Sequence, residues 1–361
     1  MLGQLGGISL NKKPILTLPP DYILKPLRTD ARGFREIGFY EMLKFASQNK
    51  ELNTALAGVE YDDKSSAALH KCDAVALSLA IFMEDQNVAQ AEHKYLSSWL
   101  IINNEVEMLK RLSTFTASYY GVMGQDLLKN HLDEQNGTIP SPAISSSSYL
   151  LLSDETFNFQ HPCVIDIKMG RQSFEPGAPS AKRDSEMQKY PQQDLFGFRI
   201  VGMRRYDPCH LNSDDNGFRK FDKMFGRELD TREKVSHAFK TFFCVATPEE
   251  SNQEVSKYNE PLGSSIPSAR IDRFIRVGVV HNLISQLKIV RKWFDENKSL
   301  AFYSSSILMV YEGGLSPTSC DTSNLKMIDF AHVRRQDGGD EGYLCGLHTL
   351  LSLLNDVLDQ N

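Results

Sequence analysis

The 361-residue sequence lacks the paired cysteines of a metal site or a compact disulfide framework. Its six cysteines are scattered and none lies in a CxxC or CxxH motif, so buried reduced thiols are expected instead. No stretch approaches the roughly 18 consecutive apolar residues of a membrane span. The first residues, MLGQLGGISLNKKP, also lack the basic-then-apolar order of a signal peptide. We therefore expect no transmembrane segment and a location in the cytoplasm, the nucleus or both.

A basic excess is missing as well. The chain has 40 Lys and Arg against 46 Asp and Glu, which gives a formal net charge of −6. This balance argues against direct binding of nucleic acid, which usually needs a large basic surface, so any anion site must be a local cluster. The P-loop pattern GxxxxGK[ST], the HRD catalytic loop and the GxGxxGxV loop are also absent. Neither a P-loop enzyme nor a protein kinase is therefore supported.

What is present is a globular composition, 41% hydrophobic and 24% charged, in a chain long enough for one large domain or two lobes. Apolar runs and alternating patterns predict strands at 22–27, 149–152, 162–169, 196–207, 306–313 and 325–333. Helical spacing predicts helices at 37–45, 65–118, 179–190 and 279–297. The third of these helices begins at a Ser N-cap and is stopped by Pro191.

Charged residues interrupt three of the predicted apolar strands. Lys25 lies inside ILKPL, Asp166 and Lys168 lie inside VIDIKMG, and Asp329 lies inside KMIDFAH. Because side chains two apart on a strand share a face, Asp166 and Lys168 leave the core together. A buried charge is costly unless it meets a partner or a ligand. A structural ion pair, or a strand end that faces water, would explain a charged residue in any one of these strands equally well. Charged residues in three strands together favour a functional site.

The combination suits phosphoryl transfer, in which catalysis is mainly placement and charge neutralisation. Lys25 would hold phosphates, Asp329 would hold Mg²⁺, and the Asp166–Lys168 pair would lie at the acceptor hydroxyl. Lys25 also precedes a predicted helix containing Glu36, which is the order of the strand lysine and helix glutamate of kinases.

A basic helix follows the Asp166–Lys168 strand. Lys182 and Lys189 lie seven residues, or two helical turns, apart and so share a face. A solvated charged face is the ordinary explanation of such lysines. Their place directly after the strand favours a polyanion site instead. Asp184 and Glu186 lie between them, and two acids facing a polyanion would repel it.

Several ordered motifs resemble those of the inositol polyphosphate kinase family. PCVIDIKMG is similar to its PxxxDxKxG signature, SSSILMVYEG to its SSLL motif, and MIDFAHV with DEGYLCGLHTLLSLL to its C-terminal block. The stretch GRQSFEPGAPSAK with GFRIVGMRRYD is most similar to the multikinase branch. Three features depart from the family pattern. The SSLL motif reads Ser-Ser-Ile-Leu, Ser153 stands in place of a hinge acid, and Asp184 and Glu186 stand in place of neutral amides.

The resemblance implies an α+β fold of two lobes, similar to protein kinases and ATP-grasp enzymes, with ATP in the cleft between them. It places the N-terminal lobe at 1–152, with a helical insertion at about 48–113, and the catalytic and inositol phosphate-binding lobe at 153–361. The implied cofactors are ATP and Mg²⁺.

The resemblance also implies roles for individual residues. Lys25 and Ser306 would lie at the nucleotide phosphates, and Asp329 would hold the metal. Asp166 would bind the ribose or order the acceptor, and Lys168 would contact the reacting inositol phosphate. The residues implied to form the hinge against adenine are Leu152, Ser153, Asp154 and Glu155. Those implied to complete the acceptor pocket are Lys182, Lys189, Arg204 and His332.

The expected activity is therefore ATP-dependent phosphorylation of a soluble inositol polyphosphate, such as the trisphosphate or tetrakisphosphate. Two alternatives are also enzymatic: an inositol hexakisphosphate kinase and a kinase of phosphoinositide headgroups. A third is an inactive scaffold that retains inositol phosphate binding. The joint presence of Lys25, Asp166, Lys168 and Asp329 argues against that third alternative.

Overall fold

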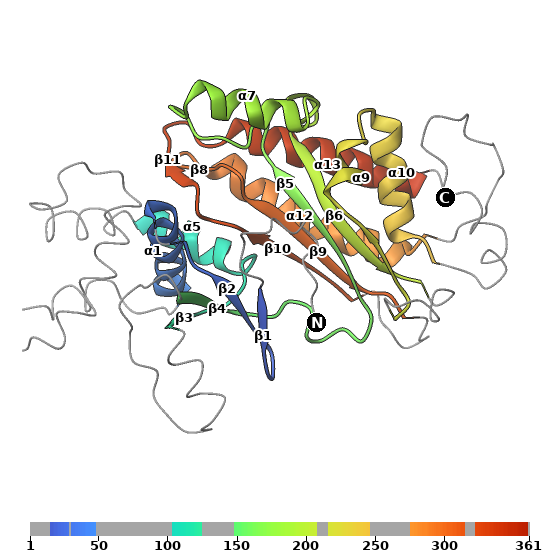
Figure 1. Cartoon of the computed structure of the whole chain (residues 1–361), viewed down its shortest axis with the longest axis horizontal. Coiled ribbons are helices and arrows are strands. Elements are labelled where there is room, and N and C mark those ends of the chain that lie inside the picture. Colours follow the sequence, from blue (N-terminus) through green and yellow to red (C-terminus); the bar gives the residue numbers. More distant parts are fainter. Residues whose placement is uncertain are drawn as a thin grey trace, which may run out of the picture.

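The computed structural model describes residues 15–28, 30–47, 103–124, 148–207, 216–245, 275–314 and 322–359. Helices and antiparallel sheets are combined in an α+β fold, as the sequence predicts (Figure 1). Most of the helical segment predicted at 65–118, and with it most of the insertion predicted at 48–113, lies outside the described residues.

A four-stranded sheet, the first sheet, is built from the residues before 154. Its strand order is β1-β2-β4-β3, and every neighbouring pair is antiparallel. The strands are β1 (Leu16–Leu18), β2 (Tyr22–Pro26), β3 (Tyr119–Gly124) and β4 (Ser148–Ser153). Two helices lie beside this sheet in Figure 1: α1 (Ala31–Ser47) and α5 (Asn103–Ser113).

A five-stranded antiparallel sheet, the second sheet, follows with the order β10-β9-β5-β6-β7. Its strands are β5 (Pro162–Met169), β6 (Phe198–Tyr206), β7 (Phe218–Phe221), β9 (Ser306–Glu312) and β10 (Ser323–Ile328). A separate ladder pairs β8 (Leu300–Phe302) with β11 (Val333–Arg335). The central strand β5 is buried on one face and carries Asp166 and Lys168 on the other, half-buried face.

Three long helices pack against the second sheet (Figure 1). They are α10 (Arg232–Phe243), α12 (Val277–Glu296) and α13 (Glu341–Asp359). Two shorter helices, α7 (Ser180–Lys189) and α8 (Gln193–Phe196), lie between β5 and β6, and a third, α9 (Lys223–Arg227), lies between β7 and α10. The apolar stripe of α12 is buried, as its spacing predicts. No helix in the described ranges is long and apolar enough to cross a membrane.

One hydrophobic core runs from the helices of the first sheet to the second sheet. Phe39 of α1 packs on Phe330, just after β10, with ring centroids 4.7 Å apart. Deeper in the core, Phe294 and Tyr343 stack with centroids 4.1 Å apart and join α12 to α13. Because α1 shares this core, the residues at its inner face are held at a fixed place relative to the end of β10.

The helix that follows β5 differs in one detail from the prediction. It begins at Ser180 and ends at Lys189, and Pro191 follows closely, as expected. The predicted Ser N-cap is wrong, because Pro179 occupies that position and no side chain caps the helix. Proline is tolerated at this position, before the first turn, because the backbone N–H that it lacks is not needed for a hydrogen bond within the helix.

Candidate active site

Lys25 of the first sheet forms ion pairs with a carboxylate of α1 and with one at the end of the second sheet. Its Nζ lies 2.6 Å from Glu36 Oε1 on α1 and 2.5 Å from Asp329 Oδ1, directly after β10. Burial alone would lower the pKa of Lys25, but the charges of Asp329 and Glu36 raise it above its ordinary value. Lys25 is therefore charged at any ordinary pH. The strand lysine and the helix glutamate that the sequence predicted do pair.

Asp329 lies in a turn that α1 holds in place. Its φ is +66°, a left-handed conformation that aspartate tolerates better than most residues. The next residue, Phe330, donates its N–H to Glu36 Oε1 at 3.1 Å, and Arg35 Nη1 donates to the carbonyl of Ala331 at 3.1 Å. The Asp329 side chain is 40% exposed, so a ligand can reach it while Lys25 holds it.

Asp166 is a half-buried carboxylate on the half-buried face of β5. Its Oδ1 is buried, as is the Oγ of Ser306 on β9, and in the described part of the chain neither atom makes a hydrogen bond of full geometry, although the Ser306 hydroxyl is near enough to lower the pKa of Asp166 slightly. Burial raises the pKa of Asp166 to about 6, the negative charge of Asp329 adds to this rise, and Lys168 opposes it. Asp166 is therefore ionised at neutral pH only at a cost in free energy, which a cation or a hydrogen-bond donor would reduce.

Lys168 lies on the same face as Asp166, two residues along β5. Its Nζ donates to the carbonyl and to the Oγ of Ser304, at 3.1 and 3.3 Å. Burial lowers the pKa of Lys168, while the charges of Asp329 and Asp166 oppose that change. Its neighbour across the ladder is Ser306 on β9. The structure thus brings Lys25, Asp166, Lys168, Ser306 and Asp329 to one end of the second sheet.

These residues fit a Mg²⁺ ion that is bound mainly through a substrate. No group of three or more His, Cys, Asp and Glu side chains within the described ranges could hold a metal by itself. Mg²⁺ normally keeps several waters and binds one or two carboxylates together with substrate phosphates. The exposed carboxylate of Asp329 and the unpaired Oδ1 of Asp166 suit such a site.

The segment predicted as a hinge is where the chain leaves the first sheet. Leu152 is buried in β4, and Ser153 Oγ accepts a hydrogen bond from the N–H of Ser118 and donates one to Glu155 Oε1. Asp154 caps the turn that follows, through Thr156. Glu155 Oε2 accepts from Asn324 Nδ2 of β10 at 2.8 Å. These side chains fix the connection between the sheets.

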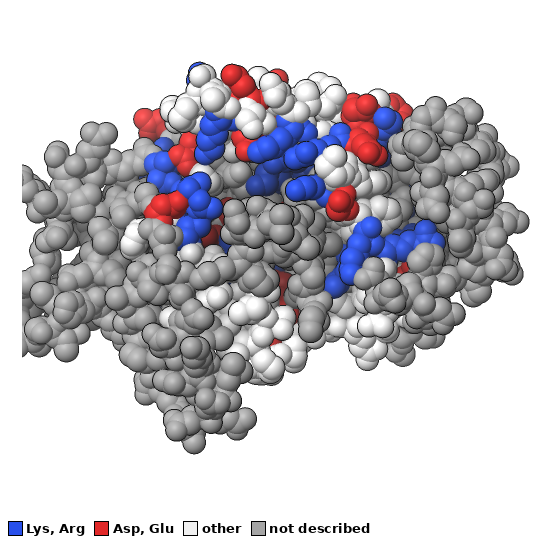
Figure 2. Space-filling model, viewed as in Figure 1, with Lys and Arg blue, Asp and Glu red and all other residues white. Residues whose placement is uncertain are grey.

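The basic helix α7 has one acid that faces inward and one that does not. Glu186 is 19% exposed and pairs with Lys189 at 2.5 Å and with Arg199 of β6 at 3.8 Å. The charges of Lys189, Arg199 and Lys168 lower its pKa despite burial. Asp184 is exposed. Glu186 therefore neutralises part of a cationic cluster, and in Figure 2 Lys and Arg side chains gather below α7 with acids among them.

Arg199 is a site residue that the sequence did not indicate. It lies directly opposite Lys168 in the β5–β6 ladder and so shares its face. No local pattern indicates it, because a loop, α7 and α8 separate β5 from β6, and the register of the two strands is visible only in the folded ladder. Arg204, predicted for the acceptor pocket, is not brought to this group. It pairs with Val164, donates to the carbonyl of Pro162 and lies over the ring of Phe218.

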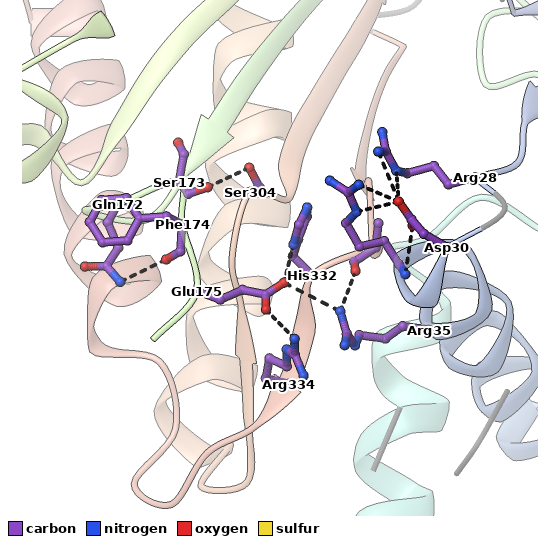
Figure 3. A network of polar contacts seen from close by, with 12 residues as sticks. Arg28, Asp30, Arg35, Gln172, Ser173, Phe174, Glu175, Ser304, His332 and Arg334 are labelled. Carbon is purple, nitrogen blue, oxygen red and sulfur yellow. Dashed lines mark hydrogen bonds and ion pairs between the residues drawn. The ribbon is translucent and has the colours of Figure 1, made fainter. Parts of the chain in front are cut away.

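His332 lies in a polar network centred on Glu175, shown in Figure 3. Its Nδ1 contacts Glu175 Oε1, and Arg334 of β11 donates to Glu175 Oε2. Arg35 of α1 lies 3.5 Å from the same carboxylate. Lys182 is exposed at the start of α7, and its charge helps to lower the pKa of Glu175. Of the predicted acceptor residues, Lys182, Lys189 and His332 therefore lie around the Lys168 end of the sheet.

Comparison with known proteins gives this geometry a context. The family model "Inositol polyphosphate kinase" matches residues 149–355. Inositol polyphosphate multikinase of Mus musculus is 31% identical over 195 residues, 53% of this chain and 40% of that protein. The Homo sapiens multikinase is 30% identical over 239 residues, 65% of this chain and 49% of that protein. Inositol hexakisphosphate kinase 3 of Homo sapiens is 27% identical over 242 residues, 58% of this chain and 51% of that protein.

The chain thus spans about half the length, or less, of these curated relatives. A crystal structure of the inositol phosphate multikinase Ipk2 from S. cerevisiae, in complex with ADP and Mn²⁺, is 21% identical. The match covers 68% of this chain and 90% of that one, with a TM-score of 0.48. The family model covers more than half of the chain, including β5, α7, β9 and the turn at Asp329. On that match, this chain belongs to the inositol polyphosphate kinase family.

Proposed function

We propose that the protein is an ATP-dependent kinase of soluble inositol polyphosphates. The observation that carries the proposal is the Lys25 bridge between Glu36 and Asp329, placed beside the Asp166–Lys168 face of β5. Positioned charge of this kind is what phosphoryl transfer needs. The names of the similar multikinases and hexakisphosphate kinase supply the acceptor class.

The reaction assigns each group a task. The acceptor hydroxyl oxygen forms a bond to the γ-phosphorus of ATP as the bond from that phosphorus to the bridging oxygen breaks, so ADP leaves and the hydroxyl proton is released to solvent. Lys25 would hold the nucleotide phosphates, and Lys168 would offset charge on the transferred group. Asp329 would hold Mg²⁺, which when bound would supply charge neutralisation for the nucleotide phosphates. Asp166 can accept a hydrogen bond from a sugar or acceptor hydroxyl.

The cations near Lys168 form two clusters that would suit an acceptor carrying several phosphates. Lys189 and Arg199 gather at Glu186, and His332 and Arg334 gather at Glu175, in the loop that Ser304 links to Lys168. The soluble acceptor class follows from the names of the similar proteins. The trisphosphate or tetrakisphosphate is proposed over the hexakisphosphate because Glu186 lies among the cations and would repel an additional phosphate.

The test is incubation with MgATP and a panel of acceptors, with the products resolved by anion-exchange chromatography. The panel contains inositol tris-, tetrakis-, pentakis- and hexakisphosphate and vesicles holding phosphoinositides. We expect turnover of the trisphosphate and tetrakisphosphate. Turnover of vesicles alone would refute the soluble acceptor, and calorimetric binding of inositol phosphates without any turnover would favour the scaffold alternative.

A further inference from the structure

Glu175 gathers three positively chargeable side chains around one carboxylate. It lies in the loop between β5 and α7 and is 16% exposed. His332 and Arg334 contact its two oxygens, and Arg35 lies 3.5 Å from Oε1. These partners come from α1, from the turn after Asp329 and from β11, so one side chain connects the loop to three other parts of the molecule (Figure 3).

The same loop also touches the partner of Lys168. Ser304 Oγ donates to the carbonyl of Ser173 at 3.2 Å, and Lys168 Nζ donates to Ser304. The loop is thus fixed at Ser173 near Lys168 and at Glu175 near His332, two residues apart. Since α7 begins soon after this loop, its position also sets where the first lysine of α7 lies.

The charges favour an ionised Glu175. Burial would raise the pKa of this carboxyl, but the hydrogen bond from His332 and the charges of His332 and Arg35 lower it. Burial and the neighbouring Arg35 lower the pKa of Arg334 to about 10. Removing the carboxylate would leave two half-buried or buried guanidinium groups without this counter-charge, which is unfavourable.

The contact with Glu175 also decides which nitrogen of His332 meets a ligand. Because Nδ1 faces the carboxylate, Nε2 lies on the far side of the ring and points away from Glu175. The turn that carries Asp329 is also held by Glu36, which accepts from the Phe330 N–H, while Arg35, a partner of Glu175, adds a bond to the Ala331 carbonyl. Loss of Glu175 should therefore disturb His332 more than the nucleotide side of the site.

We propose that Glu175 is a positioning residue for acceptor binding: it orients the His332 ring through Nδ1 and fixes the loop that leads to the basic helix. This inference rests on the proposed function, since it assigns His332 to the acceptor. An ion cluster that serves stability alone would predict loss of fold stability with no selective effect on the acceptor.

The test compares two Glu–His pairs in the full chain. Glu175→Gln removes the charge next to His332. The control, Glu312→Gln, removes the same charge from a pair with His161 at the other end of β5, where Glu312 is 15% exposed. For Glu175→Gln we expect the KM for the inositol phosphate to rise about tenfold to hundredfold, with the KM for ATP within about twofold of wild type. Glu312→Gln should match wild type in both constants.

A double-mutant cycle separates positioning from stability. If Glu175 acts through His332, Glu175→Gln should add less than about twofold to the acceptor KM of His332→Ala, because the ring it orients is gone. If the effects of Glu175→Gln and His332→Ala on the acceptor KM multiply in the double variant, the inference is overturned. It is also overturned if Glu175→Gln and Glu312→Gln have the same kinetic constants. If Glu175→Gln does not fold, Glu175→Asp keeps the charge but shortens its reach and should show the same selective rise. If wild type phosphorylates no acceptor, the proposed function itself fails.

Discussion

At the scale of single residues, Lys25 and Asp329 depend on each other across the two sheets. A carboxylate that is 40% exposed yet held by a lysine at 2.5 Å can bind a metal without moving far. We predict that Asp329→Asn lowers kcat by at least about a hundredfold, in the range found when one charge-stabilising group is removed. Calorimetry should show the inositol phosphate binding nearly as in wild type.

The matched control for this prediction is Asp337→Asn, which removes an exposed carboxylate a few residues further along the chain. Its turnover should equal that of wild type. Normal turnover in Asp329→Asn would contradict the metal assignment. Equal losses of turnover in Asp329→Asn and Asp337→Asn would show that any negative charge near the turn contributes, and that the Asp329 carboxylate has no specific role.

Asp166 gives a prediction about stability and pH. Its folded-state pKa is raised to about 6 from an ordinary 3.8, so the folded protein binds its proton more tightly than the unfolded chain does. The contribution of Asp166 to the free energy of unfolding of wild type is therefore largest below about pH 4. It falls as the pH rises through about 6. Asn cannot ionise, so Asp166→Asn should escape this loss, which is on the order of 1–3 kcal/mol.

Urea unfolding of both proteins at pH 4.5 and pH 7.5, with divalent metal removed by a chelator, tests this. The stability gained by Asp166→Asn should be larger at pH 7.5, while its turnover with MgATP should fall. An equal difference at both pH values would mean that the carboxyl does not titrate between them.

Glu186 gives a prediction about affinity. Its carboxylate lies near three cations, Lys189, Arg199 and Lys168, and reduces the positive potential that an acceptor phosphate meets. Glu186→Gln should therefore lower the KM for inositol phosphates by a few-fold, most for the most highly phosphorylated acceptor. The matched control is Asp184→Asn, because Asp184 is an exposed acid on the same helix. Identical shifts in the two variants would mean that only the net charge of α7 matters.

At the scale of elements, the sequence predicted where individual strands and helices lie better than it predicted which strands pair with one another. The apolar run around Lys25 and the spacing of α12 are local patterns, and both elements form as expected. The order β10-β9-β5-β6-β7 joins strands far apart in the chain, which periodicity does not encode. Arg199 was missed because the β5–β6 register, with its irregularity after Asp166, decides which arginine faces Lys168, and no local pattern encodes that register.

The same limit applies to side-chain partners. The charges in apolar strands, such as Lys25 and Asp329, could be recognised because burial of an unpaired charge is unfavourable wherever it occurs. Glu175 could not, since its partners lie on α1, β11 and a turn, more than a hundred residues away in each direction. Only the assembled fold shows that contact.

The packing of α13 on the β5–β6 connection gives an element-scale prediction. Gly197, with φ of +70°, ends α8 in a left-handed conformation that favours glycine, and its carbonyl accepts from Gly170 at 2.8 Å. A Cβ on Gly346 of α13 would lie 2.1 Å from that carbonyl oxygen. Gly346→Ala should therefore destabilise the fold by about 1–3 kcal/mol, although alanine normally favours a helix.

Chemical denaturation of Gly346→Ala beside His348→Ala tests this, because His348 is an exposed residue of the same helix. His348→Ala should unfold at the denaturant midpoint of wild type. A stability gain in Gly346→Ala would show that α13 can move away from Gly197 without cost.

At the scale of the whole molecule, the two sheets are joined by a continuous core and by polar contacts at the turn after β10. Phe39 packs on Phe330, and Lys25 and Glu36 reach Asp329 and the Phe330 N–H. A ligand that touches Lys25 and Asp329 therefore contacts residues from both sheets. Its binding energy should stabilise the fold as one unit rather than one sheet alone.

This leads to a prediction for thermal unfolding. MgATP at 100 times its Kd should stabilise wild type by about 2.7 kcal/mol and raise the midpoint of a single transition. Lys25→Met should lose most of that rise, because the phosphates lose their cation, yet should still be stabilised by an inositol phosphate. Lys288→Met, which removes an exposed lysine on α12, should respond as wild type does. Two separate transitions, of which MgATP moves only one, would show that the sheets unfold independently despite their shared core.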